Sequence, residues 1–408
     1  MRLLLLYGWL WIGLAGCSVS GGSNAALPLP SYPVLPVQNR LLTGAERLDS
    51  LLPLLAAKRV ACVVNHTSLC GPVTHLVDSL LRKDIQVKRI FAPEHGFRGN
   101  AEAGATIRDG KDAQTGLPVI SLYGKKKKPA PEDLADVDVV IFDIQDVGAR
   151  FYTYISTMLY VMEACAEQHK TLIVLDRPNP NGHYVDGPVL ELPWRSFVGI
   201  APIALVHGCT VGELAQMFVG EDFFKNLKGK LNLSIISCKN YTHDTPYDLP
   251  VAPSPNIPDT RSVLLYPSLC LFEGTTASLG RGTPTPFQVI GHPDFPTRTF
   301  SFVPRSVPAA LTPPQMDKTC YGYDLRAVSL QNLRAAHQLD LQYLLRFYAE
   351  FPNKNAFFLE NLFFDKLAGN ATLRQMITEG KTETEIRASW EPALATYKDM
   401  RQKYLLYP

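Results

Sequence analysis

Two stretches of the 408-residue chain join an apolar run of strand length to a cluster of chemically active side chains. The first, residues 91–99 (FAPEHGFRG), places Glu94 and His95 directly after the apolar run. The second, residues 139–154 (VVIFDIQDVGARFYTY), carries Asp143, Asp146, Arg150 and Tyr154. Carboxylates and histidines can move protons, arginines bind anions, and the nearby glycines let the backbone turn sharply. Both stretches therefore predict chemistry at the end of a strand.

Six apolar runs of strand length lie between residues 40 and 210, and helical patterns separate several of them. The runs are Val60–Val64, Val87–Ala92, Pro118–Leu122, Val137–Ile144, Leu172–Leu175 and Ile203–Val206. Near-continuous apolar strands are typical of a parallel sheet covered on both faces. Helices are predicted over 74–81 and 155–166, and Thr210 with Glu213 resembles a capping box that opens a helix at 211–219. The alternation predicts an α/β fold with a doubly wound parallel sheet.

Polar residues follow most of these strands at their carboxyl ends, where ligands bind in open α/β sheets. The set comprises Asn65, His66, Glu94, His95, Tyr123, Asp143, Gln145, Asp146, Asp176, Arg177, Asn179 and Asn181. We expect folding to gather these side chains into one pocket. Taken singly, each also has a structural explanation, because Asn and Asp favour turns and arginines form ordinary ion pairs. For Asp143 that alternative is an ion pair with Arg150 or Arg177.

The N-terminus predicts export. Arg2 precedes an apolar run from Leu3 to Ala15, which is too short to span a bilayer and is typical of a cleaved signal. The run ends in Leu–Ala–Gly–Cys, which resembles a bacterial lipobox with Cys17 as the lipidated residue. Residues 18–38 are rich in Ser, Gly and Pro and predict a flexible tether. We expect a periplasm-facing lipoprotein anchored to the inner or outer membrane, with a plain signal peptide or short anchor as the alternative.

Composition excludes several classes of partner. The formal net charge of +2 implies no strong positive field, so nucleic acid is not expected to bind, and the basic run 125–128 predicts a solvated loop. No GxGxxG or Walker sequence follows the first strand, so no nucleotide cofactor is predicted.

Seven cysteines remain besides Cys17, an odd number without a CxxC pair, and we expect mostly free, buried thiols.

The chain after the tether is long enough for two domains. We predict a catalytic domain over 39–240, cleft loops and an inter-domain segment over 241–294, and a smaller α+β domain over 295–408. The loops 251–258 and 272–284 are rich in Pro and Gly and long for mere connections, so they are candidate binding loops. The apolar tail, residues 404–407, is predicted to dock on the smaller domain.

Motifs spread over the whole chain after the tether carry a family resemblance. They are FAPEHGFRG (91–99), AGATIRD (103–109), TGLPVISLYG (115–124), VVIFDIQDVGARFYTY (139–154), LDRPNPNG (175–182), VDGPVLE (185–191), HGCTVGELA (207–215), PSPNIP (253–258), FEGTTASLGRGTPTPF (272–287), LAGN (367–370) and SW (389–390). On these motifs the chain resembles the exo-β-N-acetylmuramidases of the NamZ type, a former domain-of-unknown-function family.

The resemblance implies hydrolysis of the β-1,4 bond that joins a non-reducing-end N-acetylmuramic acid to the next sugar of a peptidoglycan fragment. It also implies a Rossmann-like catalytic domain, a smaller C-terminal domain, a cleft where they meet, and a catalytic glutamate at Glu94. Two alternatives from other classes remain. One is a lipoprotein that only binds muropeptides or disaccharides, and the other is a metal-dependent hydrolase using His66, His95, Asp143 and Asp176. No metal site is predicted, because no HExxH or comparable spacing occurs.

Cleaving a glycosidic bond requires a proton for the leaving oxygen and stabilisation of positive charge at the anomeric carbon. Glu94, between apolar neighbours, is the predicted general acid, and His95 either orients it or is structural. Asp143 and Asp146 are candidates for a nucleophile, a base or a group that positions the acetamido substituent, and Tyr154 for a charge stabiliser. The lactyl carboxylate of N-acetylmuramic acid calls for a guanidinium, for which the candidates are Arg150 and Arg281. The candidates for reading hydroxyls or the acetamido group are Asn65, Asn179 and Asn256.

Overall fold

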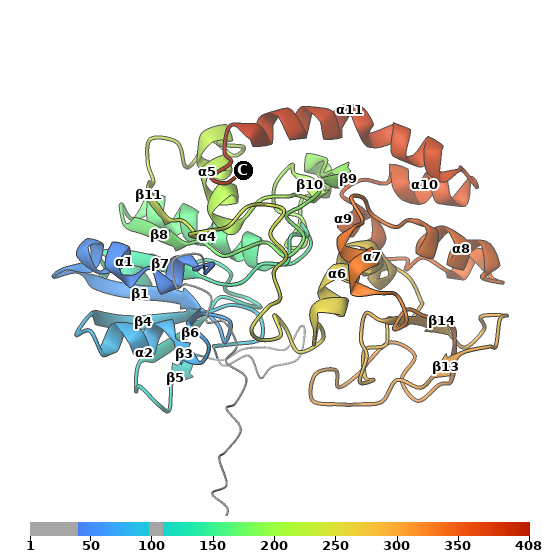
Figure 1. Ribbon diagram of the computed structural model, residues 1–408, viewed down its shortest axis with the longest axis horizontal. Helices are drawn as coiled ribbons and strands as arrows, with labels where there is room; N and C mark the ends of the chain where they lie inside the picture. The colour runs from blue at the N-terminus through green and yellow to red at the C-terminus, as the bar shows by residue number, and fades with distance from the viewer. Residues whose placement is uncertain (1–39, 98–108) are drawn as a thin grey trace, which may run out of the picture. The chain divides into compact units, whose positions relative to one another are not determined.

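A seven-stranded sheet dominates the first half of the chain in the computed structural model, which describes residues 40–97 and 109–408 (Figure 1). The parallel strands are β1 (Arg59–Val64), β4 (Gln86–Ala92), β6 (Pro118–Ser121), β7 (Val139–Asp143), β8 (Thr171–Leu175) and β11 (Asn232–Ile236), and β5 (Gly110–Lys111) is antiparallel to β6. Their order is β11-β8-β7-β1-β4-β6-β5. The order reverses between β1 and β7, as in Rossmann-type folds, and ligands bind at such a switch point.

Both faces of this sheet are covered, because alternate strand residues point to opposite sides. Cys62 and Ile141 pack in one apolar cluster with α1 (Leu48–Leu55) and α2 (Leu76–Leu81). Val63 and Phe142 pack in the other with α4 (Tyr154–Glu167) and α5 (Val211–Glu221). The predicted doubly wound parallel sheet is confirmed, and so is the capping box, in which the Thr210 hydroxyl accepts from the Glu213 N–H.

The sixth predicted strand does not join this sheet. β10 (Ala204–Val206) pairs antiparallel with β9 (Asp186–Val189) in a separate two-stranded ribbon. The sixth parallel strand is β11. Its polar residues Asn232 and Ser234 interrupt the apolar pattern, so the sequence did not predict it. It lies at the sheet edge, where a strand is buried on only part of its surface. The predicted helix at 74–81 begins instead at Leu76, because Thr74–His75 is strand β3 of a hairpin with β2 (Leu69–Cys70).

The second half of the chain is mixed α and β, as predicted. Its strands β12 (Val289–His292), β14 (Cys320–Asp324) and β13 (Ser301–Phe302) form an antiparallel sheet in that order. Its helices are α6 (Thr260–Leu269), α7 (Leu330–Arg334), α8 (Gln342–Glu350), α9 (Phe363–Ala368), α10 (Thr372–Thr378) and α11 (Glu383–Gln402). Two short helical turns, η4 (Cys270–Gly274) and η5 (Lys354–Ala356), also lie in this half, and the first half contains α3 (Pro131–Leu134), η2 (Gly44–Glu46) and η3 (Leu192–Trp194). Residues 40–408 cluster as one compact unit.

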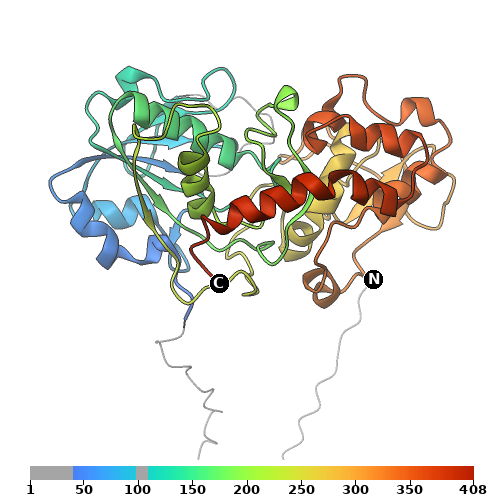
Figure 2. The same ribbon diagram turned by 90° about the horizontal axis from the view of Figure 1, so that it is seen from above.

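The predicted docking place of the C-terminal tail is wrong. Helix α11 runs back from α10 to the neighbourhood of α5, where the chain ends (Figures 1 and 2). The Tyr407 hydroxyl donates to Asp176 Oδ2 over 2.6 Å and accepts from the Cys238 N–H over 2.7 Å. Tyr404 donates to Glu221 of α5 over 2.7 Å. The tail therefore docks on the sheet-containing half, since buried polar partners there satisfy its hydroxyl groups.

The predicted state of the cysteines is confirmed for the seven in the described chain, which are all free. Six of them are buried and Cys70 is partly exposed. Within residues 40–97 and 109–408, every helix is too short or too polar to cross a bilayer. The predicted signal, Cys17 and the tether lie outside the described residues, as does the motif segment 98–108, so the structure leaves those predictions open.

Candidate active site

A cavity of about 200 Å³ opens where the turn after β4, the start of α4 and loops from the second half of the chain meet. Its lining residues are Glu94, His95, Tyr123, Phe151, Tyr152, Thr153, Tyr154, Phe197, Val198, Ser254, Ile257, Tyr266, Glu273, Arg281 and Phe363. Five sequence-predicted residues therefore face one space, namely Glu94, His95, Tyr123, Tyr154 and Arg281. They come from positions almost 190 residues apart, so only the folded chain brings them together.

Glu94 is held by a tight turn directly after β4. The Gly96 N–H donates to the Pro93 carbonyl over 3.0 Å, and His95 has φ +68°, a conformation that non-glycine residues rarely adopt. Such strain persists where the surroundings enforce it, and it is concentrated at functional sites. The Thr153 hydroxyl, one residue before α4, donates to Glu94 Oε2 over 2.9 Å. The carboxylate is thereby aimed into the cavity from a fixed position.

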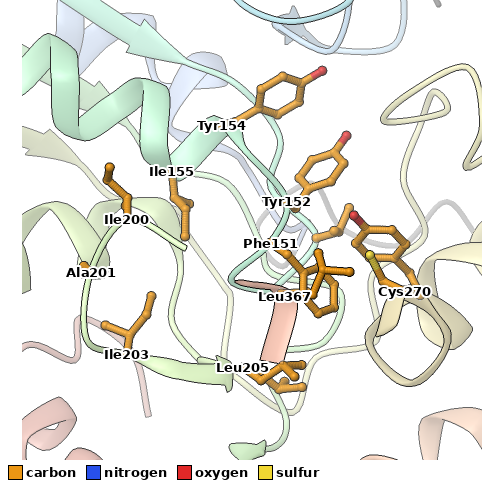
Figure 3. Packing of buried hydrophobic residues seen from close by; sticks show 14 of the residues in the cluster. Phe151, Tyr152, Tyr154, Ile155, Ile200, Ala201, Ile203, Leu205, Cys270 and Leu367 are labelled. Atoms are coloured by element: carbon orange, nitrogen blue, oxygen red, sulfur yellow. The ribbon is translucent and has the colours of Figure 1, made fainter. Parts of the chain in front are cut away.

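Three tyrosine hydroxyls surround this carboxylate. The pKa of Tyr123 is raised by burial first, and then by the charge of Glu94 and a hydrogen bond to it. The pKa of Tyr154 is raised by burial and then by the charge of Glu94. Tyr152 donates to the Pro253 carbonyl over 2.8 Å and packs edge-on against Tyr154. All three phenols stay protonated at neutral pH, and Figure 3 shows the hydroxyls of Tyr152 and Tyr154 pointing away from the packed apolar residues.

Behind Tyr154 lies a group of buried polar atoms that form no hydrogen bond of ordinary geometry with a described residue. They are the Tyr154 hydroxyl, Asn65 Nδ2 and Asp146 Oδ1. Asn65 Oδ1 accepts from Thr67, and Asp146 Oδ2 accepts from the Gly148 N–H over 2.7 Å. Both side chains act on the pKa of Tyr154, which places them close to its hydroxyl. Since buried polar atoms are nearly always paired, this group is suited to hold water or a substrate polar group.

Asp143 does not face the cavity. Its carboxylate is fully buried and forms a two-pronged ion pair with Arg177, with Oδ1 at 2.6 Å from Nε and Oδ2 at 2.9 Å from Nη2. Arg177 also donates to the Leu69 carbonyl over 3.1 Å. The alternative prediction for Asp143, an ion pair with Arg150 or Arg177, is confirmed with Arg177 as the partner. Its predicted catalytic role does not fit this position, because both oxygens are already engaged inside the scaffold.

Arg150 is also a scaffold residue, contrary to its predicted role as a substrate anchor. Its side chain is fully buried, and its guanidinium donates to four backbone carbonyls. The acceptors are Pro188 (2.7 Å), Ile203 (2.8 Å), Leu367 (3.0 Å) and Ala368 (2.7 Å). Gly369, with φ +85°, makes room for the guanidinium, because a Cβ at this position would lie only 2.6 Å from Arg150 Nη2. The LAGN motif thus forms part of a clamp around Arg150.

Two of the three predicted asparagines hold loops together. Asn179 is buried, donates to the Cys209 carbonyl over 2.9 Å and accepts from the Asn181 N–H over 2.9 Å. Asn256 donates to the Ala309 carbonyl over 2.7 Å. Neither residue lines the cavity. Their predicted contact with substrate does not fit these positions, because their polar groups satisfy buried backbone atoms.

Arg281 reaches the cavity together with a carboxylate that sequence reasoning missed. Its Nε donates to Glu273 Oε1 over 2.8 Å, and its guanidinium lies 5.2 Å from the centre of the Phe287 ring. The pKa of Arg281 is raised, because attraction to Glu273 outweighs burial. Glu273 lies in the FEGTTASLG motif, which was the one available signal for it. Phe197 and Tyr266 carry no such signal, since their place in the wall depends on distant loops.

The side chains considered for a metal site are not brought together as ligands. Over the described ranges, no group of three or more His, Cys, Asp or Glu side chains is placed to hold an ion. His66 Nε2 lies 2.8 Å from the Ala252 carbonyl, and Asp143 is paired with Arg177. Asp176 accepts from the hydroxyls of Thr210 (2.7 Å) and Tyr407. Each of these groups has a structural partner instead.

Comparison with known proteins decides the family. A family profile described as "Exo-beta-N-acetylmuramidase NamZ, N-terminal" matches residues 60–261, and its C-terminal counterpart matches residues 264–407. The chain belongs to the NamZ family. The predicted resemblance and the assignment as a glycoside hydrolase are thereby confirmed. The lining of the cavity draws on residues from both matched segments.

A curated relative and two solved structures agree with this assignment. The chain is 39% identical over 381 residues to the peptidoglycan β-N-acetylmuramidase NamZ of Bacillus subtilis, covering 88% of this chain and 90% of the relative. Crystal structures of two DUF1343 family proteins from Bacteroides fragilis have the same fold. One is 44% identical with a TM-score of 0.83 and covers 90% of this chain and 99% of its own. The other is 29% identical with a TM-score of 0.77 and covers 91% and 100%.

Proposed function

We propose that this NamZ family member releases N-acetylmuramic acid from the non-reducing end of peptidoglycan fragments by hydrolysing the β-1,4 bond. The observation that carries the proposal is the placement of Glu94. This glutamate is the cavity carboxylate that is held in place by a strained turn and by the Thr153 hydroxyl.

In this proposal Glu94 donates a proton to the leaving glycosidic oxygen, a role typical of one member of the carboxyl pair in glycosidases. Over the whole reaction a water molecule supplies the hydroxyl group that bonds to the anomeric carbon and the proton that restores Glu94. Tyr154 stays neutral, because burial and the neighbouring charge raise its pKa, and its oxygen faces the positive charge that develops at the anomeric carbon. Asp146 acts from behind Tyr154, where its negative charge favours the same transition state. His95 contributes by fixing the turn that presents Glu94.

A disaccharide with N-acetylmuramic acid at the non-reducing end tests this proposal. The purified protein is expected to release free N-acetylmuramic acid and the second sugar in equal amounts. A disaccharide with N-acetylglucosamine at the non-reducing end is the matched control and should stay intact. Cleavage of the control at a similar rate, or binding of the first disaccharide without products, would contradict the proposal, and the second result would favour the binding-protein alternative.

We further propose that the protein is exported and anchored through a lipid on Cys17, so that it meets cell-wall fragments outside the cytoplasm. The support lies in the sequence, where Arg2, the apolar run from Leu3 and Leu–Ala–Gly–Cys follow the order of a lipoprotein signal. Residues 18–38, which are rich in serine, glycine and proline, would then join the lipid to the rest of the chain.

A further inference from the structure

The charges on the described cavity wall provide no spare cation for an acidic sugar. Glu94 and Glu273 are the carboxylates of this wall, and Arg281 is its guanidinium. The 2.8 Å hydrogen bond from Arg281 Nε to Glu273 balances that guanidinium. Arg150 is buried among backbone carbonyls and is not exposed to the cavity. A substrate carboxylate entering here would therefore meet at least as much negative as positive charge from the described lysine, arginine and acidic side chains.

Lys127 lies directly against this wall. Its Nζ is 4.5 Å from the centre of the Phe197 ring, and Phe197 lines the cavity. The centre of the same ring is 6.1 Å from the centre of the Tyr123 ring, which also lines the cavity. The charge of Glu94 and a hydrogen bond to it raise the pKa of Tyr123 after the larger effect of burial, so Glu94 lies close by. A lysine has a flexible four-carbon stem, so its ammonium can move from the ring face to a nearby anion.

The loop that carries Lys127 is fixed by its neighbours. Lys126 Nζ is 2.5 Å from Asp133 Oδ2, and Lys128 Nζ is 2.6 Å from Glu167 Oε1. Lys127, between them, forms no ion pair with a described residue, and its contact is the aromatic ring. The two flanking lysines are therefore neutralised, whereas the charge of Lys127 is still available. Of the run 125–128, Lys125 is exposed and the other three lysines are half-buried, so the predicted solvated loop describes Lys125 alone.

We propose that Lys127 binds a carboxylate of the substrate held in the cavity and so selects muramic-acid-type sugars over neutral ones. This proposal rests on the proposed function and adds a specificity residue to it. The carboxylate is that of a free lactyl group or of a peptide attached to the lactyl group, and the chemistry is the same for both. The contact with Phe197 keeps the ammonium beside the wall while the cavity is empty, because cations are attracted to ring faces.

The test compares Lys127→Gln with the charge-preserving Lys127→Arg and with Lys125→Gln, a matched control from the same loop. The substrates are an aryl N-acetylmuramide and its lactyl methyl ester, which differ by one negative charge. Lys127→Gln is expected to raise KM for the acid about tenfold, the loss expected for a charged hydrogen bond, with kcat little changed. KM for the ester should not change. Lys127→Arg should restore most of the affinity, and Lys125→Gln should match the wild type.

A muropeptide substrate distinguishes the two sources of the carboxylate. A penalty for Lys127→Gln on the peptide-free sugar assigns the lactyl group, and a penalty only on the muropeptide assigns the peptide. Equal behaviour of Lys127→Gln and Lys125→Gln on every substrate would overturn the proposal.

Calorimetric binding of N-acetylmuramic acid to the Glu94→Gln protein, with and without Lys127→Gln, gives a readout that needs no turnover. Weaker binding by the protein with Lys127→Gln supports the proposed role of Lys127. If the wild-type protein nevertheless releases no product from the disaccharide, only the proposed function fails. Unchanged binding with normal release contradicts the role of Lys127 alone.

Discussion

The polar residues at the sheet edge fall into two groups according to whether their side chains face the scaffold or the cavity. The first group binds buried ionic or backbone partners and comprises Asp143, Arg150 and Asn179. The side chains of Glu94 and Tyr154 face the cavity. The sequence shows the residue type and its strand-end position but not the partner. The separation into scaffold and site therefore becomes visible only in the fold.

At Asp143 we predict a loss of stability rather than a specific loss of catalysis. Asp143→Asn leaves the buried Arg177 without its counter-ion, and removing one partner of a buried pair costs about 3–5 kcal/mol. Urea unfolding should show this loss. The kcat of the remaining folded protein should stay within a few-fold of the wild type. A variant of normal stability but without activity would contradict this prediction and would show that Asp143 takes part in catalysis.

At Arg150 we predict that the charge matters for folding and not for substrate choice. Arg150→Met removes donors from four buried carbonyls, and each unsatisfied buried group costs about 1–3 kcal/mol. Thermal unfolding should therefore occur at a clearly lower temperature, and expression should suffer. The ratio of kcat/KM for the muramide to that for its methyl ester should be unchanged. A changed ratio in a normally stable variant would mean that Arg150 reads the acid.

Strand order explains how much of the site could be predicted. Parallel strands bring their carboxyl ends to one edge, so the sequence correctly predicted that the residues after β4 and β7 lie at the same end of the sheet. It could not predict that β10 leaves the sheet, because three apolar residues read alike in a parallel strand and in a ribbon. Nor could it place Glu273 or Phe197, whose contacts depend on chain segments far away in sequence.

The C-terminal tail gives a prediction that depends on pH. Burial raises the pKa of Asp176 from 3.8 to about 6, and the hydrogen bond from Tyr407 counteracts part of this rise. Because the folded pKa exceeds the unfolded one, this group's contribution to stability is complete below about pH 4 and is lost as pH rises to about 6, up to about 3 kcal/mol in total.

Tyr407→Phe should raise the pKa of Asp176 further, since it removes a donor to the carboxylate. The variant should therefore lose more stability than the wild type as pH rises above about 6. We expect the difference in unfolding free energy to be larger at pH 8 than at pH 5, as measured by urea unfolding at both values. A difference that is independent of pH would show that Tyr407 does not interact with the ionised carboxylate.

On the scale of the whole molecule, the cavity requires both halves of the chain. Glu94 and Tyr154 come from the sheet-containing half, and Glu273 and Arg281 come from the half that follows residue 260. The Arg150 clamp and the tail tie these segments together, because both join residues about 200 positions apart. We therefore expect the two halves to unfold in a single transition.

Attachment of the whole protein to a membrane is predicted to depend on one residue. Cys17→Ser removes the proposed lipid acceptor and leaves the sequence from residue 40 onwards unaltered. The variant should lose labelling by a fatty acid and move from the membrane fraction to a soluble fraction, with unchanged activity on small substrates. Retention of the label and of membrane attachment would contradict the lipidation.

The most direct test of Glu94 as the acid is the activity of Glu94→Gln on two leaving groups. A proton is needed for a sugar leaving group but hardly for a dinitrophenolate. We predict that Glu94→Gln lowers kcat about a thousandfold on the muramic-acid-terminated disaccharide, much less on the dinitrophenyl muramide, and leaves the unfolding midpoint unchanged. Equal losses on both substrates, or a wild-type rate on the disaccharide, would contradict the account.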